Sequence, residues 1–508
     1  MTSLDGRLSI SIPSDIMQIY LHILSVLKKA HAYNMFCFCM VFLHRKLILE
    51  EILFMLKNQR IFRIYSGIDI RGDKNVERIL INRLGPIKHC ELEIRDFMVF
   101  TGPQASGKST IAKSIFFFKN IKNLLIMQIN KRFFDESETK ELSIRNRLLK
   151  EIRSNFLETF GTTWCMDEEM SMEYYYTDTV YIKIDLQNDP ISHNYVWIDF
   201  SPELIRFLCS YDNKKFDLLN HANDSERIKK EIDAFFESNE EIIYIPAGRS
   251  MMTLFSSQLI FMYSIMSDDQ KRRLDYCTRN YLERIMQLKP VFTESVQALI
   301  KNKLELTDLK INKDKLQQCA DLMKQILQGE YRTVDGEERL QMADNRYVKI
   351  NFASSGQQEA VWILNVVFYY LLNNRKSFFI IEEPESHLFP NAQKLITEFI
   401  SLAKNDGNKV LLTTHSPYIL GTINNMLYAN RISKQVDQGA LENIMPPSKW
   451  LDFKNLAAYY VDAGSIHSCL DDEFESIQNE IIDGASEDIN TDFEKMADLR
   501  YASEQGGE

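Results

Sequence analysis

Residues 102–109 read Gly-Pro-Gln-Ala-Ser-Gly-Lys-Ser, which matches the pattern Gly-x-x-x-x-Gly-Lys-Ser/Thr at every fixed position. The short apolar run at residues 97–101 precedes this loop, and a helical pattern follows it from Lys108. A glycine-rich loop between a buried strand and a helix lets backbone N–H groups surround phosphate oxygens, and the helix N-terminus adds positive potential. The sequence therefore predicts a phosphate-binding loop.

Side chains at the start of the helix give this loop its chemistry. Lys108 can reach the β- and γ-phosphates of a nucleotide, and the Ser109 hydroxyl can ligate Mg²⁺. Thr110 adds a further phosphate contact. The residues of this segment that we expect to contact ATP are Gly102, Gln104, Ser106, Gly107, Lys108, Ser109 and Thr110.

Adjacent carboxylates end a second buried run. The apolar residues 378–381 are followed by Glu382, Glu383, a proline and Glu385. Such a run is typical of a parallel strand, and α/β folds bind ligands where these strands end. We expect Glu382 to face Mg²⁺ and Glu383 to polarise an attacking water. For Glu385, a structural role and a catalytic role both remain open.

Two more segments carry candidate phosphate contacts. Residues 353–359 read Ala-Ser-Ser-Gly-Gln-Gln-Glu and open a helix, where a Ser-Gly pair is either a second anion site or an ordinary helix cap. Residues 413–417 read Thr-Thr-His-Ser-Pro and end the next buried run. A histidine there, His415, can hydrogen-bond a γ-phosphate or the attacking water.

Hydropathy patterns place these motifs in an α/β fold. Alternating or apolar runs predict strands, and 3.6-residue periodicity predicts helices. The predicted strands are residues 78–83, 90–94, 97–101, 377–381 and 409–413, with further strands within 172–200 and 330–352. The predicted helices are residues 108–122 and 392–404, with helical stretches in 131–160, 203–237 and 251–329, from residue 356 and after residue 417.

Together these motifs resemble the ABC-type ATPase head of the SMC/RecF group. The resemblance implies a P-loop fold with a mixed sheet and flanking helices, ATP and Mg²⁺ as ligands, and a dimer that holds ATP between subunits. It also assigns roles: residues 102–109 are the Walker A loop, Glu382 ends the Walker B strand, Glu383 is catalytic, and 386–389 is a D-loop. The signature motif is then Ser355, Gly356 and Gln357, and His415 is the switch histidine.

A narrower resemblance concerns the longer motif strings. Residues 382–390 (Glu-Glu-Pro-Glu-Ser-His-Leu-Phe-Pro) and 413–418 are similar to the OLD-like ATPases of bacterial anti-phage systems, which include PtuA of Septu and AriA of PARIS. Residues 85–88 and 245–250 also look like that group. The resemblance implies a sensor or scaffold subunit that works with a separate nuclease or toxin subunit. The signature departs from the transporter pattern, with Ser-Gly-Gln-Gln in place of Ser-Gly-Gly-Gln.

These assignments divide the chain into five regions. We expect an N-terminal helical extension outside the core (1–75), a Walker A lobe (76–122), a large, mainly helical insertion (123–346), a lobe with signature, Walker B and switch histidine (347–430), and a C-terminal region with an acidic tail (431–508). Gln128 is a candidate for the Q-loop glutamine. Arg249 could stabilise transition-state charge or form a structural salt bridge.

Composition bounds the remaining options. The net charge of −11 belongs to the tail, because the last 38 residues contain thirteen acids and two bases. The eight cysteines show no Cys-x-x-Cys pair, and residues 16–43 lack an apolar run long enough to span a membrane. No basic, cleavable leader is recognisable. These features predict a cytoplasmic protein with reduced thiols and no membrane partner.

The chain offers no recognisable nuclease. No strand ends in an Asp-x-Asp pair, and Asp471, Asp472 and Glu473 fall in a stretch predicted to be helical. DNA remains a candidate partner through basic residues of the insertion, although interleaved acids favour a solvated helix surface. The alternative function is a RecF-like repair clamp that acts on DNA without a nuclease partner. The basic residues concerned are Lys131, Arg132, Arg145, Arg147, Lys150, Arg153 and 271–273.

Overall fold

The computed structural model describes most of the protein. The described residues are 76–134, 142–187, 194–212, 214, 221–306, 312–342, 346–478 and 490–497. The extension predicted for residues 1–75 lies outside them, as does most of the acidic tail after residue 478. Residues 75–508 form one of the two compact units into which the chain divides.

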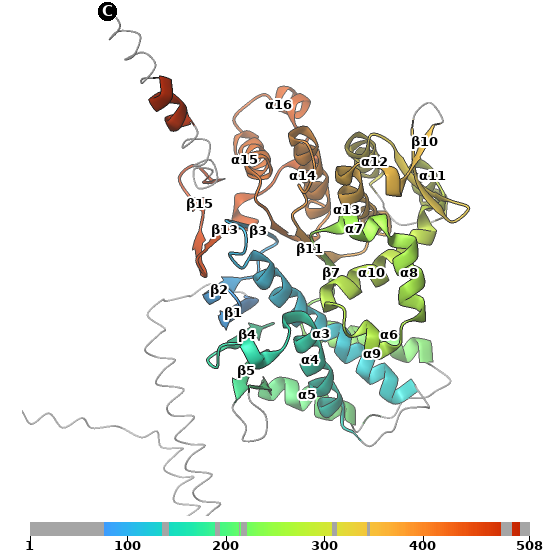
Figure 1. Cartoon of the computed structure of the whole chain (residues 1–508), viewed down its shortest axis with the longest axis vertical. Coiled ribbons are helices and arrows are strands. Elements are labelled where there is room, and N and C mark those ends of the chain that lie inside the picture. The colour runs from blue at the N-terminus through green and yellow to red at the C-terminus, as the bar shows by residue number, and fades with distance from the viewer. Residues whose placement is uncertain are drawn as a thin grey trace, which may run out of the picture. The chain divides into compact units, whose positions relative to one another are not determined.

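A mixed sheet lies at the centre of this unit, with the order β14-β13-β3-β12-β11-β7 (Figure 1). Five strands are parallel to their neighbours, and β14 runs antiparallel to β13. The phosphate loop, the acidic run and the histidine segment therefore leave the sheet at one edge, because parallel strands end on the same side. The strand bounds are β3 Phe97–Thr101, β7 Glu241–Ile245, β11 Ser377–Glu382, β12 Lys409–Thr413, β13 Leu456–Asp462 and β14 Ser465–Ser468.

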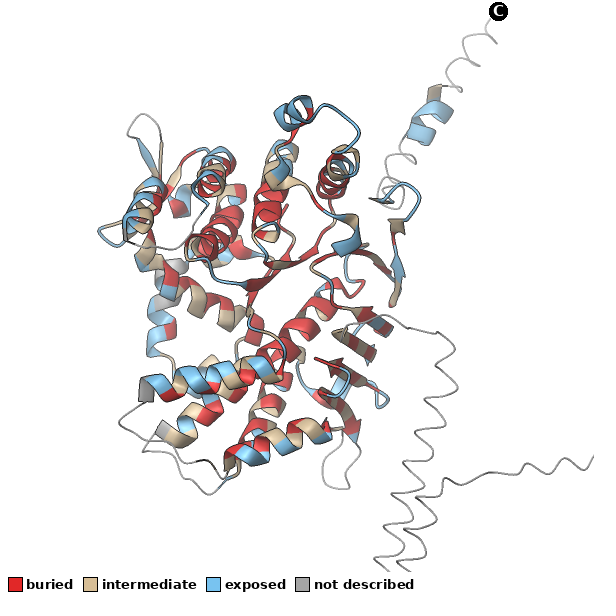
Figure 2. Ribbon diagram, turned by 180° about the vertical axis from the view of Figure 1, so that it is seen from behind, coloured by how far each residue is buried: buried red, intermediate tan, exposed pale blue. Residues whose placement is uncertain are grey.

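Helices cover both faces of this sheet. Successive side chains of a strand point to opposite faces, so Met98 and Phe100 pack in one core cluster while Phe97 and Val99 pack in the other. Figure 2 shows the buried residues concentrated in the central strands and the inward faces of the helices. The first cluster contains α3 (Lys108–Phe134) and α4 (Ile144–Phe160). The second contains α12 (Lys313–Leu327), α13 (Ser355–Leu372), α14 (Pro390–Lys404) and α15 (Pro417–Ile432).

A second, antiparallel sheet has the order β2-β1-β4-β5-β6 and shares the cluster of α3 and α4. The strands predicted at residues 78–83 and 90–94 are confirmed as β1 and β2, which pair antiparallel. The strands predicted within residues 172–200 become the other three. The bounds are β1 Arg78–Leu84, β2 Ile87–Glu93, β4 Ser171–Tyr175, β5 Tyr181–Gln187 and β6 Tyr195–Phe200.

The segment between the Walker A helix and the signature contributes to both sheets. It supplies β4, β5 and β6 to the antiparallel sheet and the edge strand β7 to the central one, where β7 pairs with β11. Its helices are α5 Pro202–Asp212, α6 His221–Phe235, α7 Arg249–Leu254, α8 Ser256–Ile265, α9 Asp268–Lys271, α10 Tyr276–Leu288 and α11 Val296–Leu306. Three short strands, β8 Glu330–Val334, β9 Glu337–Gln341 and β10 Tyr347–Lys349, form a separate sheet before the signature.

The C-terminal region adds structure that the sequence patterns did not predict. After α16 (Gln438–Ile444), β13 pairs with β3 and so lies beside the phosphate loop. The helix expected around Asp471 is wrong: Leu470–Asp471 and Ser476–Ile477 pair as β15 and β16. Asp471 Oδ1 accepts hydrogen bonds from the backbone N–H groups of Glu473 and Phe474, which stabilise the intervening turn.

None of the helices in the described part of the chain is both long and apolar enough to cross a membrane.

Candidate functional site

The phosphate loop connects β3 to α3 in a conformation that requires glycine. Gly102 has φ +136° and Gly107 has φ +112°, values that residues with a Cβ atom rarely adopt. A Cβ atom on Gly102 would also lie 2.2 Å from the carbonyl oxygen of Val461 on β13. The first glycine of the motif is therefore fixed by its own backbone and by a C-terminal strand pressed against it.

Lys108 lies under the loop and is only 5% exposed. Its Nζ atom donates hydrogen bonds to the carbonyl oxygens of Gly102 (2.9 Å) and Pro103 (2.7 Å). Burial lowers the pKa of this ammonium, while the nearby carboxylates of Glu383, Glu385 and Glu382 oppose that shift. The structure therefore brings the predicted phosphate-binding lysine and the predicted acidic strand end into one electrostatic neighbourhood.

The remaining predicted ATP-binding residues of the loop differ in their exposure. Gln104 and Ser109 are exposed and Thr110 is half-buried, whereas Ser106 is buried and its hydroxyl has no hydrogen-bond partner. A cavity of about 960 Å³ begins at Ser109 and Thr110. Its other walls come from the β1–β2 turn, the end of α4 and the 3₁₀ turn Thr163–Cys165 that follows. The space next to the loop thus accommodates a ligand larger than a phosphate group.

Glu382, the last residue of β11, is 4% exposed. Its Oε2 atom accepts a hydrogen bond from the backbone N–H of Ala247 at 3.1 Å. Its Oε1 atom is buried and makes no full hydrogen bond, although the buried hydroxyl of Tyr244, which is also unpaired, lies close enough to interact with this carboxylate. A buried carboxylate oxygen without a partner is costly unless a cation or water satisfies it, so the predicted Mg²⁺ fits this position.

Glu383 follows in a strained backbone conformation, with φ +42°. Its N–H donates to the carbonyl oxygen of Thr413 at 2.9 Å, which ties β11 to β12. The Ser386 hydroxyl donates to Glu383 Oε2 at 3.1 Å, and His415 Nε2 lies 3.6 Å from Oε1. The close contact with His415 contributes most to holding the pKa of Glu383 below its usual value, so this carboxylate remains ionised. The two residues predicted to be catalytic therefore lie side by side.

Glu385 has a different environment from Glu383. It is buried, and its Oε1 atom accepts hydrogen bonds from the backbone N–H of His415 and the hydroxyl of Thr414, both at 2.7 Å. Burial raises the pKa of this carboxyl. Of the two roles left open, the contacts favour the structural one, since Glu385 holds the backbone that presents His415.

The predicted signature lies at the N-terminus of α13. Ser354 is the N-cap and forms a capping box with Gln357, and Gln357 Nε2 also donates to the carbonyl oxygen of Leu327 at 2.7 Å. Ser355 is exposed. A Cβ atom on Gly356 would lie 2.6 Å from the carbonyl oxygen of His387, so this glycine allows α13 to touch the predicted D-loop.

The signature is not part of the cavity at the phosphate loop. Among the described residues that line this cavity, none belongs to 353–359. Lys108 and Glu383 do not line this cavity either, since Ser109, Thr110 and Lys113 are its only described lining residues from the phosphate loop and α3. Three large apolar side chains are exposed near these motifs. Phe352 precedes the signature and is 76% exposed, Phe389 ends the predicted D-loop and is 74% exposed, and Tyr418 follows the switch histidine and is 53% exposed.

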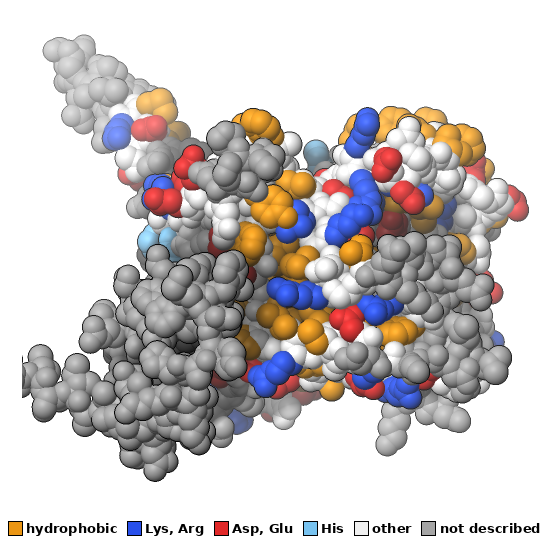
Figure 3. Space-filling view, turned by 90° about the horizontal axis from the view of Figure 1, so that it is seen from below, with side chains coloured by type: hydrophobic (Ala, Val, Ile, Leu, Met, Phe, Trp, Pro, Cys, Tyr) orange, Lys and Arg blue, Asp and Glu red, His pale blue; other side chains and the backbone are white. Residues whose placement is uncertain are grey.

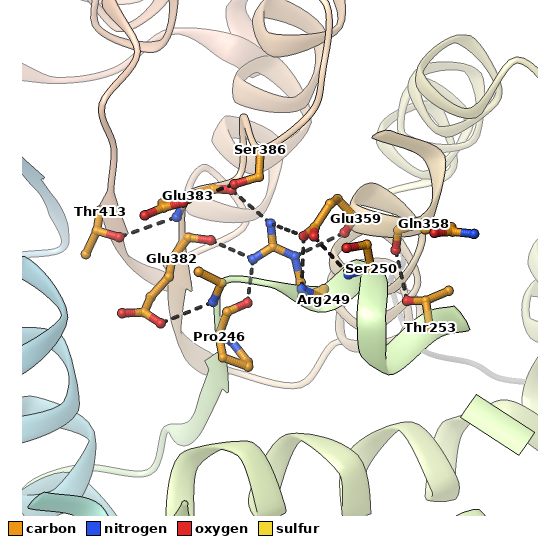
Figure 4. A network of polar contacts seen from close by, with 11 residues as sticks. Pro246, Arg249, Ser250, Thr253, Gln358, Glu359, Glu382, Glu383, Ser386 and Thr413 are labelled. Atoms are coloured by element: carbon orange, nitrogen blue, oxygen red, sulfur yellow. Dashed lines mark hydrogen bonds and ion pairs between the residues drawn. The ribbon is translucent and has the colours of Figure 1, made fainter. Parts of the chain in front are cut away.

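Arg249 is the polar residue whose role the sequence could not settle. It is fully buried and donates hydrogen bonds to the carbonyl oxygens of Pro246, Glu359, Glu382 and Glu383 (Figure 4). It also forms an ion pair with the carboxylate of Glu359 at 3.2 Å. Because its donors are already occupied, the structure favours the structural alternative over a direct contact to a transition state.

Gln128 is not at the site, and its prediction as a Q-loop residue is wrong. It lies inside α3 and is 4% exposed. It is about 30 Å along the helix axis from Lys108, at 1.5 Å per residue. The sequence spacing suggested a loop because the continuation of α3 beyond residue 122 was not predicted.

The basic residues of the insertion are largely engaged with neighbours. Arg132 forms an ion pair with Asp212, Arg272 with Glu151 and Glu158, and Arg153 Nε donates to a backbone carbonyl oxygen. On the face seen in Figure 3, acidic and apolar side chains separate the basic ones. Direct DNA binding therefore stays a prediction. In the described part of the chain, no group of three or more His, Cys, Asp or Glu side chains could hold a metal ion.

The sequence of the chain matches one family of known proteins. The family model described as "AAA ATPase domain" matches residues 75–420. No curated protein matches the sequence significantly.

Three solved structures are similar at low identity. An SMC head domain from Thermotoga maritima has 10% identity and a TM-score of 0.29, covering 69% of this chain and 92% of its own. An SMC head bound to the C-winged helix domain of ScpA has 12% identity and a TM-score of 0.35, covering 78% and 97%. An Smc head with an extended coiled coil, bound to the C-terminal domain of ScpA from Pyrococcus furiosus, has 12% identity and a TM-score of 0.33, covering 78% and 95%.

Proposed function

The chain belongs to the AAA ATPase domain family, and from this membership we propose that it hydrolyses ATP between two copies of itself. In this proposal each ATP is bound by the phosphate loop of one subunit and by the signature of the other. The observation that carries the proposal is the exposed position of Ser355 at the N-terminus of α13. In a dimer, a second subunit would present this serine to the nucleotide bound by the phosphate loop of the first.

The surroundings of Ser355 support a protein contact there. Phe352 and Phe389 are largely exposed, and Gly356 brings α13 against the segment that carries Phe389. Large apolar side chains near an anion-binding turn are what an interface needs, since association is driven chiefly by burial of apolar surface. A symmetric dimer would bury this surface twice and would create two equivalent ATP sites.

The residues of the site divide the chemistry between them. Lys108 binds the β- and γ-phosphates after leaving the carbonyls of Gly102 and Pro103. Mg²⁺, held by Ser109 and Glu382, would neutralise phosphate charge during transfer. Glu383 accepts the proton of the attacking water, because its depressed pKa keeps it ionised at neutral pH. His415 orients that carboxylate and can sense the γ-phosphate.

A test of this mechanism is the variant Glu383→Gln, which keeps the shape of the side chain but removes the base. Hydrolysis should fall by about 100-fold or more, the usual contribution of a general base, while ATP affinity is retained. The variant should also accumulate as an ATP-dependent dimer in light-scattering measurements. Full turnover by this variant would refute the assignment of Glu383.

At the biological level, we propose that the ATPase is the sensor or scaffold subunit of an anti-phage complex with a separate nuclease subunit. Support comes from the similarity of residues 382–390 and 413–418 to OLD-like defence ATPases. The test is affinity purification from the native gene neighbourhood, followed by mass spectrometry. A stoichiometric nuclease or toxin-like partner supports the proposal. Recovery of the chain alone or with DNA only would favour a RecF-like repair clamp instead.

A further inference from the structure

Arg249 is a fully buried cation at the point where three elements meet. It begins α7, and residues 246–248 connect it to the end of β7. Its guanidinium donates to the carbonyl oxygens of Pro246 (2.5 Å) and Glu382 (2.6 Å) through Nη1, and to that of Glu383 (2.8 Å) through Nη2. The Nε atom donates to the carbonyl oxygen of Glu359 at 3.1 Å. One side chain therefore connects the segment after β7, the end of β11 and helix α13 (Figure 4).

The partner carboxylate reinforces this connection from the side of α13. Glu359 is 1% exposed and lies four residues after Ser355. Its Oε1 atom accepts the backbone N–H of Ser250 at 2.8 Å, and its Oε2 atom accepts that of Arg249 at 3.1 Å. The carboxylate thus caps the start of α7 while it pairs with the guanidinium. Glu359 therefore ties the N-terminal part of the signature helix to the start of α7.

The other end of the network holds the backbone of the catalytic residue. The guanidinium binds the carbonyl oxygens on both sides of the Glu383 Cα atom, those of Glu382 and of Glu383 itself. Glu383 has φ +42°, a conformation that persists only where the surroundings fix it. Because the backbone angles at Glu383 set the direction of its side chain, these two hydrogen bonds aim the carboxylate toward His415.

We propose that Arg249 and Glu359 couple the signature helix to the hydrolytic centre, so that contact at Ser355 adjusts the position of Glu383. Arg249 is a positioning residue in this scheme, and it acts through the peptide groups of residues 382 and 383. The inference rests on the proposed function, since it assumes hydrolysis by Glu383 and an ATP contact at Ser355. It adds the physical route by which binding at one turn controls chemistry at the other.

The structure also supplies a matched control. Thr253, buried in the same helix, donates a hydrogen bond from its hydroxyl to the carbonyl oxygen of Gln358 at 2.9 Å. This contact joins α7 to α13 as the arginine does, but it does not reach β11. Thr253→Val therefore disturbs the helix pair without touching the peptide groups around Glu383.

The main experiment compares steady-state ATP hydrolysis by Arg249→Lys, Glu359→Gln and Thr253→Val. Lysine keeps the charge but cannot span the same acceptors, so kcat should fall by about tenfold or more while KM for ATP changes by less than about threefold. Glu359→Gln should also lower kcat with little change in KM. Thr253→Val should have the same kcat and KM as the unaltered chain. ATP-dependent dimerisation should persist in all three. A lysine variant with normal kcat, or one that loses kcat and ATP affinity together, overturns the inference.

A second measurement needs no variant and so remains decisive if the buried charge pair is essential for folding. Backbone hydrogen exchange is followed in the full chain with and without a non-hydrolysable ATP analogue. Residues 247–253 should gain protection together with residues 355–360 and 382–386, because the network links them. Protection that appears at 355–360 and 382–386 but not at 247–253 overturns the inference.

Failure of the inference is distinguishable from failure of the proposed function. If the unaltered chain does not hydrolyse ATP, the proposed function fails. If Glu383→Gln is inactive while Arg249→Lys keeps a normal kcat, only the coupling role of Arg249 fails.

Discussion

Helices α3 and α13 both begin at turns rich in glycine and serine, but their surroundings are opposite. The start of α3 is enclosed. Lys108 is buried, the backbone of β13 lies against Gly102, and the carboxylates of residues 382, 383 and 385 lie near the lysine. The start of α13 exposes Ser355, and Gln357 is turned back into its own chain. One turn is therefore enclosed by its own chain, whereas the other presents Ser355 at the surface, where a ligand or a second subunit could reach it. A site shared between two subunits requires one enclosed turn that binds the phosphates and one exposed turn that can reach the other subunit.

The largest expected effect comes from the enclosed turn. Lys108→Ala removes the cation that binds the β- and γ-phosphates, and the loss of charge-assisted hydrogen bonds should weaken ATP binding by about 100-fold. Hydrolysis should be lost with it. Isothermal titration with ATP and Mg²⁺ measures the affinity. Unchanged affinity would show that the nucleotide is bound elsewhere.

A different pattern is expected from the exposed turn. Ser355→Arg places a bulky side chain on the signature surface, so a partner subunit could not close over the nucleotide. ATP affinity should remain within about threefold, whereas kcat should fall by about 100-fold through loss of a transition-state contact. Nucleotide titration and steady-state kinetics separate the two effects. If affinity fell as far as it does for Lys108→Ala, both turns would belong to one intramolecular site.

The acidic strand end between the two turns predicts a pH effect. Because the close contact with His415 is the main cause of the lowered pKa of Glu383, His415→Ala should raise that pKa. Glu383 acts as a base only above its pKa, so the acidic limb of the profile of kcat/KM against pH should move to higher pH in the variant. The position of the limb is read independently of the overall rate. A limb that does not move would mean that another group controls it.

The smallest effect should come from Gln357. The sequence resemblance assigns it to the nucleotide, but its side chain forms the capping box and bonds to the carbonyl oxygen of Leu327. Gln357→Ala should lower the free energy of unfolding by about 1 kcal/mol, the usual value for a cap or a single hydrogen bond, and leave ATP affinity nearly unchanged. Urea denaturation measures the free energy of unfolding, and nucleotide titration measures the affinity for ATP. If the variant lost much of its ATP affinity but kept its free energy of unfolding, Gln357 would contact the nucleotide, as the sequence resemblance implies.

Local patterns allowed much of the fold to be predicted. The strands at 97–101 and 409–413 coincide with β3 and β12, because an apolar run bounded by a glycine loop or a polar turn is a local signal. The same holds for the Walker A loop and the acidic end of β11, since their chemistry follows from residues adjacent in the sequence. Whether these residues act on ATP as predicted depends on the experiments above.

Contacts between distant segments could not be predicted. Arg249 meets Glu359 across 110 residues, and which carbonyl oxygens it binds depends on the backbone at Glu383 rather than on any pattern. The pairing of β13 with β3 was also missed, although the apolar run from Leu456 and the Asp-Ala-Gly turn after Val461 provide a strand and hairpin signal. A single sequence gives no register for strands that meet from opposite ends of the chain.

The central claim, that each ATP site is shared between two subunits, can be tested by mixing two inactive variants. Lys108→Ala has a defective loop but an intact signature, and Ser355→Arg has the reverse. In a mixed dimer the intact loop of one chain meets the intact signature of the other. Equal mixing should restore about a quarter of normal activity, because half of the dimers would carry one complete site. A mixture no more active than the two variants alone would contradict the shared site.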